Sequence, residues 1–113
     1  MTVRTKQLAC GESAWLGNTY LTVYTCPVGY RTIVKDLRLF RRLGDVAGEF
    51  IVSILKSSGT RADVDRYQIL NNLQRATNPV WVVLEEGDEL QLYATTNVTY
   101  RYVISGTELD LQP

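Results

Sequence analysis

Short runs of β-branched and aromatic residues, interrupted at close intervals by Gly, Pro, Asn and Asp, dominate this 113-residue sequence. Such runs are typical of strands, because strand side chains alternate between two faces while the interrupting residues form turns. The predicted strands cover residues 3–8, 20–25, 31–40, 49–56, 67–73, 80–84, 89–95 and 99–105. About eight short strands at this spacing indicate an all-β fold, an antiparallel β-sandwich or jelly-roll-like arrangement, rather than alternating strands and helices.

The connections between these strands carry recognisable turn residues. Pro27 presets its own φ and Gly29 tolerates a positive φ, so the two residues can reverse the chain. Gly87 and Asp88 form a second predicted turn, and residues 43–45 (Leu-Gly-Asp) predict a hairpin between the third and fourth strands.

One segment also fits a helix, because four of its apolar residues fall three apart: Val64, Tyr67, Leu70 and Leu73. Two asparagines at 71 and 72 are poor helix residues and suit a bulge, so a strand is the favoured interpretation. A chain of 113 residues is expected to form a single domain spanning residues 1–113.

The charges exclude several classes of partner. Twelve basic and twelve acidic residues cancel, so we expect neither nucleic acid nor an anionic membrane surface to bind. Residues 1–10 contain no apolar leader core, and the chain has no apolar run of the roughly 20 residues that span a membrane. Synthesis in a cytoplasm is expected, where Cys10 and Cys26 would more often stay reduced than pair.

Several predicted strands have apolar or aromatic residues on both faces. Leu21 and Val23 suit a core, whereas Tyr20, Thr22 and Tyr24 occupy the opposite face. A domain of this size has one core to cover such strands, so another copy of the chain is expected to cover the second face. Tyrosine and tryptophan are enriched at buried interface centres, and the candidate contacts between copies are Tyr20, Tyr24, Trp81, Tyr100 and Tyr102.

The sequence argues against catalysis. Histidine is absent, which removes the commonest general base and the commonest zinc ligand. Cys10 and Cys26 are too far apart for a Cys-x-x-Cys motif, and no Gly-rich phosphate loop occurs. The carboxylates of residues 85–89 are expected to be a solvated hairpin tip. We therefore predict no catalytic residues, no metal and no cofactor.

Two segments resemble a known family: residues 24–39, YTCPVGYRTIVKDLRL, and residues 82–109, VVLEEGDELQLYATTNVTYRYVISGTEL. They are similar to small virion structural proteins of tailed bacteriophages, which are β-sandwich accessory proteins of the tail or capsid. Matching positions include Pro27, Gly29, Gly87, Asp88 and Gly106. Cys26 and Glu86 depart from the family pattern, which has Val and Pro there.

The resemblance implies a non-enzymatic bacteriophage structural protein located in the virion, forming a symmetric homo-oligomer on the tail or tail tip. A trimer is the expected closed form, and neighbouring major capsid or tail proteins are the expected partners. The alternative within the same particle is a capsid decoration protein that cements the head.

A carbohydrate-binding module is the alternative from another functional class. Trp15 is the candidate glycan contact, because the glycines and polar residues around it suit an exposed loop from which the ring could stack on a sugar. The competing interpretation of Trp15 is packing in the core or at an interface.

Overall fold

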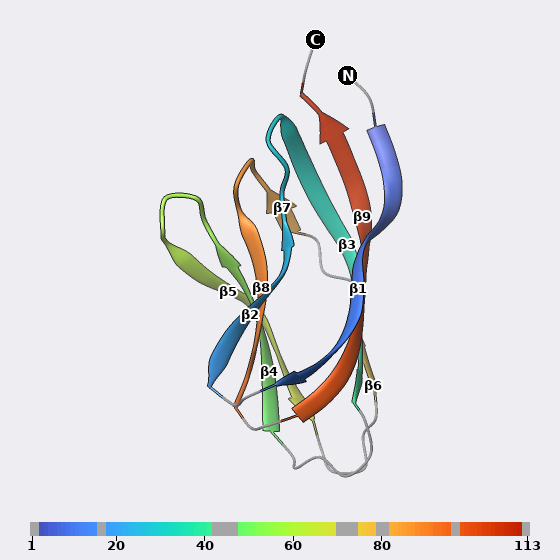
Figure 1. Ribbon diagram of the computed structural model, residues 1–113, viewed down its shortest axis with the longest axis vertical. Helices are drawn as coiled ribbons and strands as arrows, with labels where there is room; N and C mark the ends of the chain where they lie inside the picture. Colours follow the sequence, from blue (N-terminus) through green and yellow to red (C-terminus); the bar gives the residue numbers. More distant parts are fainter. Residues whose placement is uncertain are drawn as a thin grey trace.

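The computed structural model describes residues 3–15, 18–41, 48–69, 75–78, 82–95 and 98–111. These residues form nine strands and no helix, in two antiparallel sheets that pack face to face (Figure 1). The prediction of an all-β antiparallel sandwich is therefore confirmed.

The first sheet, sheet A, contains the longest strands of the molecule. Its order is β1 (Val3–Trp15), β9 (Val98–Asp110) and β3 (Tyr30–Arg41), followed by two short strands that share the far edge of β3. These are β7 (Val82–Leu84), beside the first half of β3, and β6 (Arg75–Asn78), beside its second half. Together β6 and β7 occupy the place of one interrupted strand.

The second sheet, sheet B, has the order β2 (Thr19–Thr25), β8 (Glu89–Ala94), β4 (Gly48–Leu55) and β5 (Arg61–Ile69). All of its pairings are antiparallel. Strands β1 to β4 alternate between sheet A and sheet B, and β8 and β9 also lie in different sheets. With β6 and β7 counted as one strand, this gives two four-stranded layers in jelly-roll order.

The predicted hairpin between the third and fourth strands is wrong. The two strands, β3 and β4, lie in different sheets, and residues 43–45 themselves fall outside the described residues. A local turn signal marks a reversal of the chain but does not say whether the chain re-enters the same sheet. The hairpin of sheet B instead joins β4 to β5 through residues 56–60.

Other strand boundaries also differ from prediction. β1 continues to Trp15, so the loop expected around Trp15 is a strand paired with β9. β5 begins at Arg61 and runs as a strand to Ile69, which excludes the helical alternative for the part that is described. β6 was not predicted, because its sequence, RATN, has no alternation of apolar residues.

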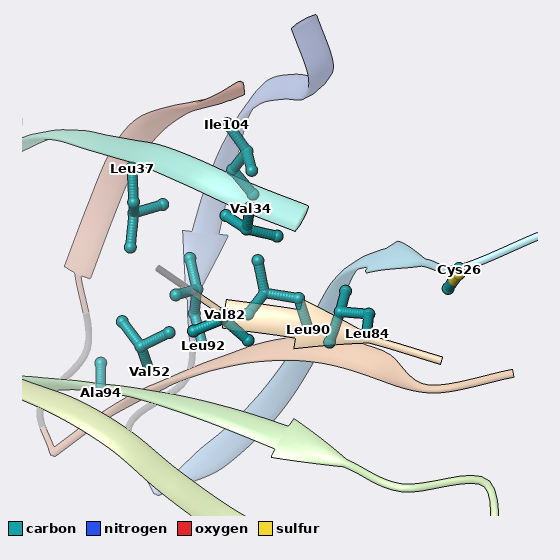
Figure 2. Close-up of a cluster of buried hydrophobic side chains, with 10 residues drawn as sticks. All are labelled: Cys26, Val34, Leu37, Val52, Val82, Leu84, Leu90, Leu92, Ala94 and Ile104. Carbon is teal, nitrogen blue, oxygen red and sulfur yellow. The ribbon is translucent and has the colours of Figure 1, made fainter. Parts of the chain in front are cut away.

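The core lies between the sheets. Leu37 and Val34 of β3 and Ile104 of β9 face Leu90 and Leu92 of β8 across the interior (Figure 2). The remaining buried members are Cys26, Val52, Val82, Leu84 and Ala94. Cys26 lies at one end of this cluster, next to the turns that join β2 to β3 and β7 to β8.

The strand pairing in sheet A is irregular at one position along β9. The pairing of β9 shifts register on both sides, at Leu8 in β1 and at Lys35 in β3, beside Ser105 and Gly106. A Cβ atom at Gly106 would lie 2.2 Å from the carbonyl oxygen of Ile33, so only glycine allows β3 to approach this closely.

Candidate functional site

Asp88 ties together three turns at one end of the sandwich. Its side chain is almost fully buried, and its carboxylate accepts a hydrogen bond from the Lys56 ammonium at 2.6 Å. It also accepts bonds from the backbone N–H groups of Ser57, at 3.0 Å, and Glu85, at 2.9 Å. The turn of residues 85–88 is thereby fastened to the turn between β4 and β5.

The balance of these contacts keeps Asp88 charged. Burial by itself raises the pKa of the carboxyl group, but the bonds from Lys56, Glu85 and Ser57 outweigh it and hold the pKa below its usual value. The predicted solvated hairpin tip is thus wrong for Asp88, although Glu85 and Glu86 are exposed. Glu85 pairs with Arg31 on the surface.

Cys26 continues this network toward sheet A. Its backbone N–H donates to the Asp88 carbonyl at 2.9 Å, and its own carbonyl accepts from Gly87 at 3.1 Å. The buried Thr32 hydroxyl donates to the Cys26 sulfur at 3.3 Å. Burial raises the pKa of the Cys26 thiol, so the group is a packed thiol rather than a reactive thiolate.

Tyr24 completes the link between the sheets. A bulge between Thr22 and Tyr24 turns the tyrosine toward the core, so the expected common face of Tyr20 and Tyr24 is not found. The Tyr24 hydroxyl donates to the Glu108 carboxylate at 2.7 Å and lies 2.8 Å from the Thr32 hydroxyl. Burial raises the pKa of Tyr24 well above its usual value, with the neighbouring Glu108 adding to the effect.

These contacts form a continuous polar chain, which we call the cross-sheet network: Lys56, Asp88, Cys26, Thr32, Tyr24 and Glu108. It runs from the β4–β5 turn of sheet B to strand β9 of sheet A. These hydrogen bonds connect the two sheets, so the network acts as a structural tie between them.

A second group of ordered side chains lies on the outer face of sheet B. The Arg61 guanidinium stacks on the Tyr20 ring, with its central carbon 3.8 Å from the ring centroid. The Tyr93 ring is 4.7 Å from Tyr20 on the neighbouring strand, and the Tyr93 hydroxyl donates to Asn18 at 2.7 Å. Arg61 thus reaches from one edge strand, β5, to the other, β2.

Hydrogen bonds hold this layer in place. The Arg61 Nε donates to the Gln91 side-chain oxygen at 3.1 Å, and the Gln91 amide donates to the Thr22 hydroxyl at 3.0 Å. Thr22 in turn donates to Glu89 at 2.6 Å. We call the following set the outer layer of sheet B: Asn18, Tyr20, Thr22, Arg61, Gln91 and Tyr93.

The candidate interface residues fall in several places. Tyr20 belongs to the outer layer, and Tyr24 to the cross-sheet network. Tyr102 packs against the core and covers Gly11, where an added Cβ would lie 2.8 Å from the tyrosine hydroxyl. Trp81 and the side chains of Tyr100 and Trp15 lie outside the described part of the chain.

The turn residues have the backbone that the sequence suggests. Gly29 has a φ of 83° and Gly87 a φ of 84°, both in the region that favours glycine. Tyr30 donates its N–H to the Pro27 carbonyl at 3.2 Å, which closes the first turn.

Sequence reasoning missed the outer layer. Arg61 and Tyr20 are 41 positions apart in the numbering, and Arg61 lies outside the predicted strands. The stacking depends on the order β2-β8-β4-β5, which no local pattern reveals.

The described residues contain no candidate metal centre and no membrane-spanning helix. No group of three or more Cys, Asp or Glu side chains in these ranges could hold a metal ion. No helix long and apolar enough to cross a membrane occurs in the same part of the chain.

Comparison by sequence found no match, either to a family model or among curated proteins. Comparison by structure found similar chains. The chain is similar to a protein of Bacillus endospore appendages, described as a family of disulfide-linked pili, with a TM-score of 0.59 and 12% identity over 98% of this chain and 90% of that one.

Viral proteins share the fold as well. A chain of the infectious bursal disease virus Gx strain aligns with a TM-score of 0.57 and 11% identity over 95% of this chain. A chain of the T=1 particles derived from infectious bursal virus aligns with a TM-score of 0.54 and 11% identity over 95% of this chain. This chain spans 32% and 30% of those two chains. At such identities the likeness shows a common jelly-roll fold alone.

Proposed function

We propose that the chain is a non-enzymatic structural subunit of a virion, and that it works by assembling with copies of itself. The observation that carries the proposal is the fold: a nearly whole-length likeness to a pilus protein and a likeness to part of a viral particle protein. Both comparison proteins are described as parts of assemblies. The phage-like turn motifs described above support a virion of a tailed bacteriophage.

The polar side chains support a scaffold rather than an active site. The buried carboxylate of Asp88 and the thiol of Cys26 are both engaged in bonds that join turns and sheets. A rigid sandwich with this interior suits a subunit whose outer surfaces make the contacts.

The finer proposal is a closed homo-oligomer, with a trimer expected, on the tail or tail tip. Contacts to neighbouring tail or major capsid proteins would fix it in the particle. Decoration of the capsid is the competing location, and gold-labelled antibody against this chain on intact virions would distinguish head from tail.

The test of assembly is the mass of the purified chain, measured by light scattering at about 1 to 100 μM, where contacts with micromolar or lower dissociation constants populate the oligomer. We expect a discrete multiple of 12.8 kDa. Replacing Trp81 or Tyr100 by Ser is expected to reduce the mass while the chain stays folded. A matched control is Val28→Ser, at an exposed turn position. A monomer over the whole range contradicts the proposal.

A further inference from the structure

The outer layer of sheet B is more densely hydrogen-bonded and stacked than an exposed sheet face requires. Fixing long polar side chains costs conformational entropy, and on an ordinary solvated face this cost is not recovered. Here Gln91, a member of the layer, and Ser53, on the same outward side of the sheet, are both nearly fully buried. The hydrogen-bonding groups of this face are therefore tied to one another and to a ring.

Arg61 is held differently from two other described arginines. Arg31 and Arg38 each bind a carboxylate, Glu85 and Asp36 respectively, at 3.0 Å. Arg61 instead stacks on an aromatic ring and uses its Nε to bind an amide oxygen. Its terminal guanidinium nitrogens make no ion pair with a described carboxylate, so this planar donor group is positioned but not neutralised.

The charges around Arg61 determine what it can bind. Asp63 lies two residues further along β5, and its carboxylate accepts from the Ser53 hydroxyl at 2.7 Å. Glu89, on β8, accepts from Thr22. Asp63 and Glu89 thus place two carboxylates on the same face as Arg61, and these disfavour an anionic ligand and an acidic partner.

We propose that the outer layer of sheet B binds a neutral polysaccharide. Sugar hydroxyls both donate and accept, so they match a surface that offers a guanidinium, two carboxylates and neutral amide and hydroxyl groups side by side. The Tyr93 ring supplies apolar area of the kind that packs on the C–H face of a sugar, whereas the Tyr20 ring supports the Arg61 guanidinium. The layer extends across the width of sheet B, about 14 Å for three strand spacings, which suits an extended chain.

The roles within the site follow from geometry. Arg61 donates to ring or hydroxyl oxygens, and Asp63 and Glu89 accept from hydroxyls. Gln91 is too buried for a direct contact and positions Arg61. This site is distinct from Trp15. Its Tyr20 is also a candidate contact between copies, so the experiment has to separate sugar binding from assembly.

The experiment is a titration of the isotope-labelled full chain, followed by the amide NMR signals of β2, β5 and β8. The probes are cellohexaose, maltohexaose and chitohexaose as neutral chains, and hexagalacturonate as an acidic one. We expect one or more of the neutral chains to shift the signals of Thr22, Arg61 and Tyr93, and hexagalacturonate to leave them in place. Light scattering on the same samples records the mass, so a failure of assembly is seen separately.

Arg61→Met keeps the bulk of the side chain but removes its donors, and we expect it to weaken sugar binding by about tenfold, or 1.4 kcal/mol. Tyr20→Leu provides a second variant if the first is poorly folded. Arg31→Met, on sheet A, is the matched control and is expected to bind like the parent. The proposal is overturned if none of the neutral chains binds, if the acidic chain alone binds, or if folded Arg61→Met retains full affinity. It is also overturned if these signals shift only with protein concentration, because the layer would then be a contact between copies.

Discussion

Tyr24 and Glu108 join the two sheets of the sandwich through a single hydrogen bond of 2.7 Å. Tyr24 is in β2 of sheet B, and the nearly fully buried Glu108 is in β9 of sheet A. A buried carboxylate is costly unless it is hydrogen-bonded, so the bond from the tyrosine hydroxyl stabilises that end of the molecule. The bond exists because the bulge in β2 turns Tyr24 inward.

Tyr24→Phe is expected to lower the free energy of unfolding by about 1–3 kcal/mol, because it leaves the Glu108 carboxylate short of one donor. Urea denaturation followed by circular dichroism measures the change. Tyr93→Phe is the control, since that hydroxyl bonds Asn18 on the surface, and its loss should be much smaller. Equal losses in the two variants would show that the cross-sheet bond contributes no more to the free energy of unfolding than a surface bond does.

Asp88→Asn is expected to destabilise the fold at pH 7 by about 1–3 kcal/mol, because the charge that Lys56 and two backbone N–H groups bind is removed. The folded pKa of Asp88 lies below the ordinary value of 3.8. Its contribution is therefore complete above pH 3.8 and is lost as the pH falls through the folded pKa.

The pH dependence supplies the decisive comparison for Asp88. Parent and variant should differ at pH 7 and converge under strongly acidic conditions, as measured by melting temperature across the acid range. Curves that stay parallel down to the most acidic point would contradict the assignment of this carboxylate as a stabilising charge.

Gly106→Ala is expected to cost more than about 2 kcal/mol or to prevent folding, since its Cβ would meet the Ile33 backbone oxygen, which cannot move alone. Gly11→Ala is the comparison variant. We expect it to cost less, because its Cβ would meet the end of the Tyr102 side chain, which can shift. Thermal unfolding of both variants tests the order. A milder effect at Gly106 than at Gly11 would mean that β3 and β9 can separate there.

The two cysteines should differ in reactivity. Cys10 is exposed, whereas Cys26 is buried and burial raises the pKa of its thiol. Iodoacetamide at neutral pH should therefore label one thiol in the folded chain and both in urea, as counted by mass spectrometry. Rapid labelling of Cys26 in the native chain would show that this end of the sandwich opens.

Part of this fold could be predicted from the sequence because its signals are local. Alternation of Leu21 and Val23 with polar neighbours marks a strand, and glycine at positions 29 and 87 marks a backbone with positive φ. Bulges limit predictions that are based on alternation. A bulge reverses the alternation, so Tyr24 faces the core although simple alternation assigns it to the face of Tyr20.

The candidate sites were less predictable. Asp88 was recognised as a turn residue, but its burial depends on Lys56 and Ser57, which come from another turn. Arg61 carries no motif, and its significance appears only when β5 and β2 are placed at opposite edges of one sheet.

The amino-acid sequence by itself determined that the chain forms antiparallel strands joined by glycine-containing turns, because side-chain alternation and φ preferences act over a few residues. The tertiary structure alone decided which strands share a sheet, which side of each bulge faces inward, and which polar groups meet. Those outcomes depend on pairings between residues such as Tyr24 and Glu108, 84 positions apart. Such residues meet only when the two sheets pack together, and no local sequence pattern predicts the contact.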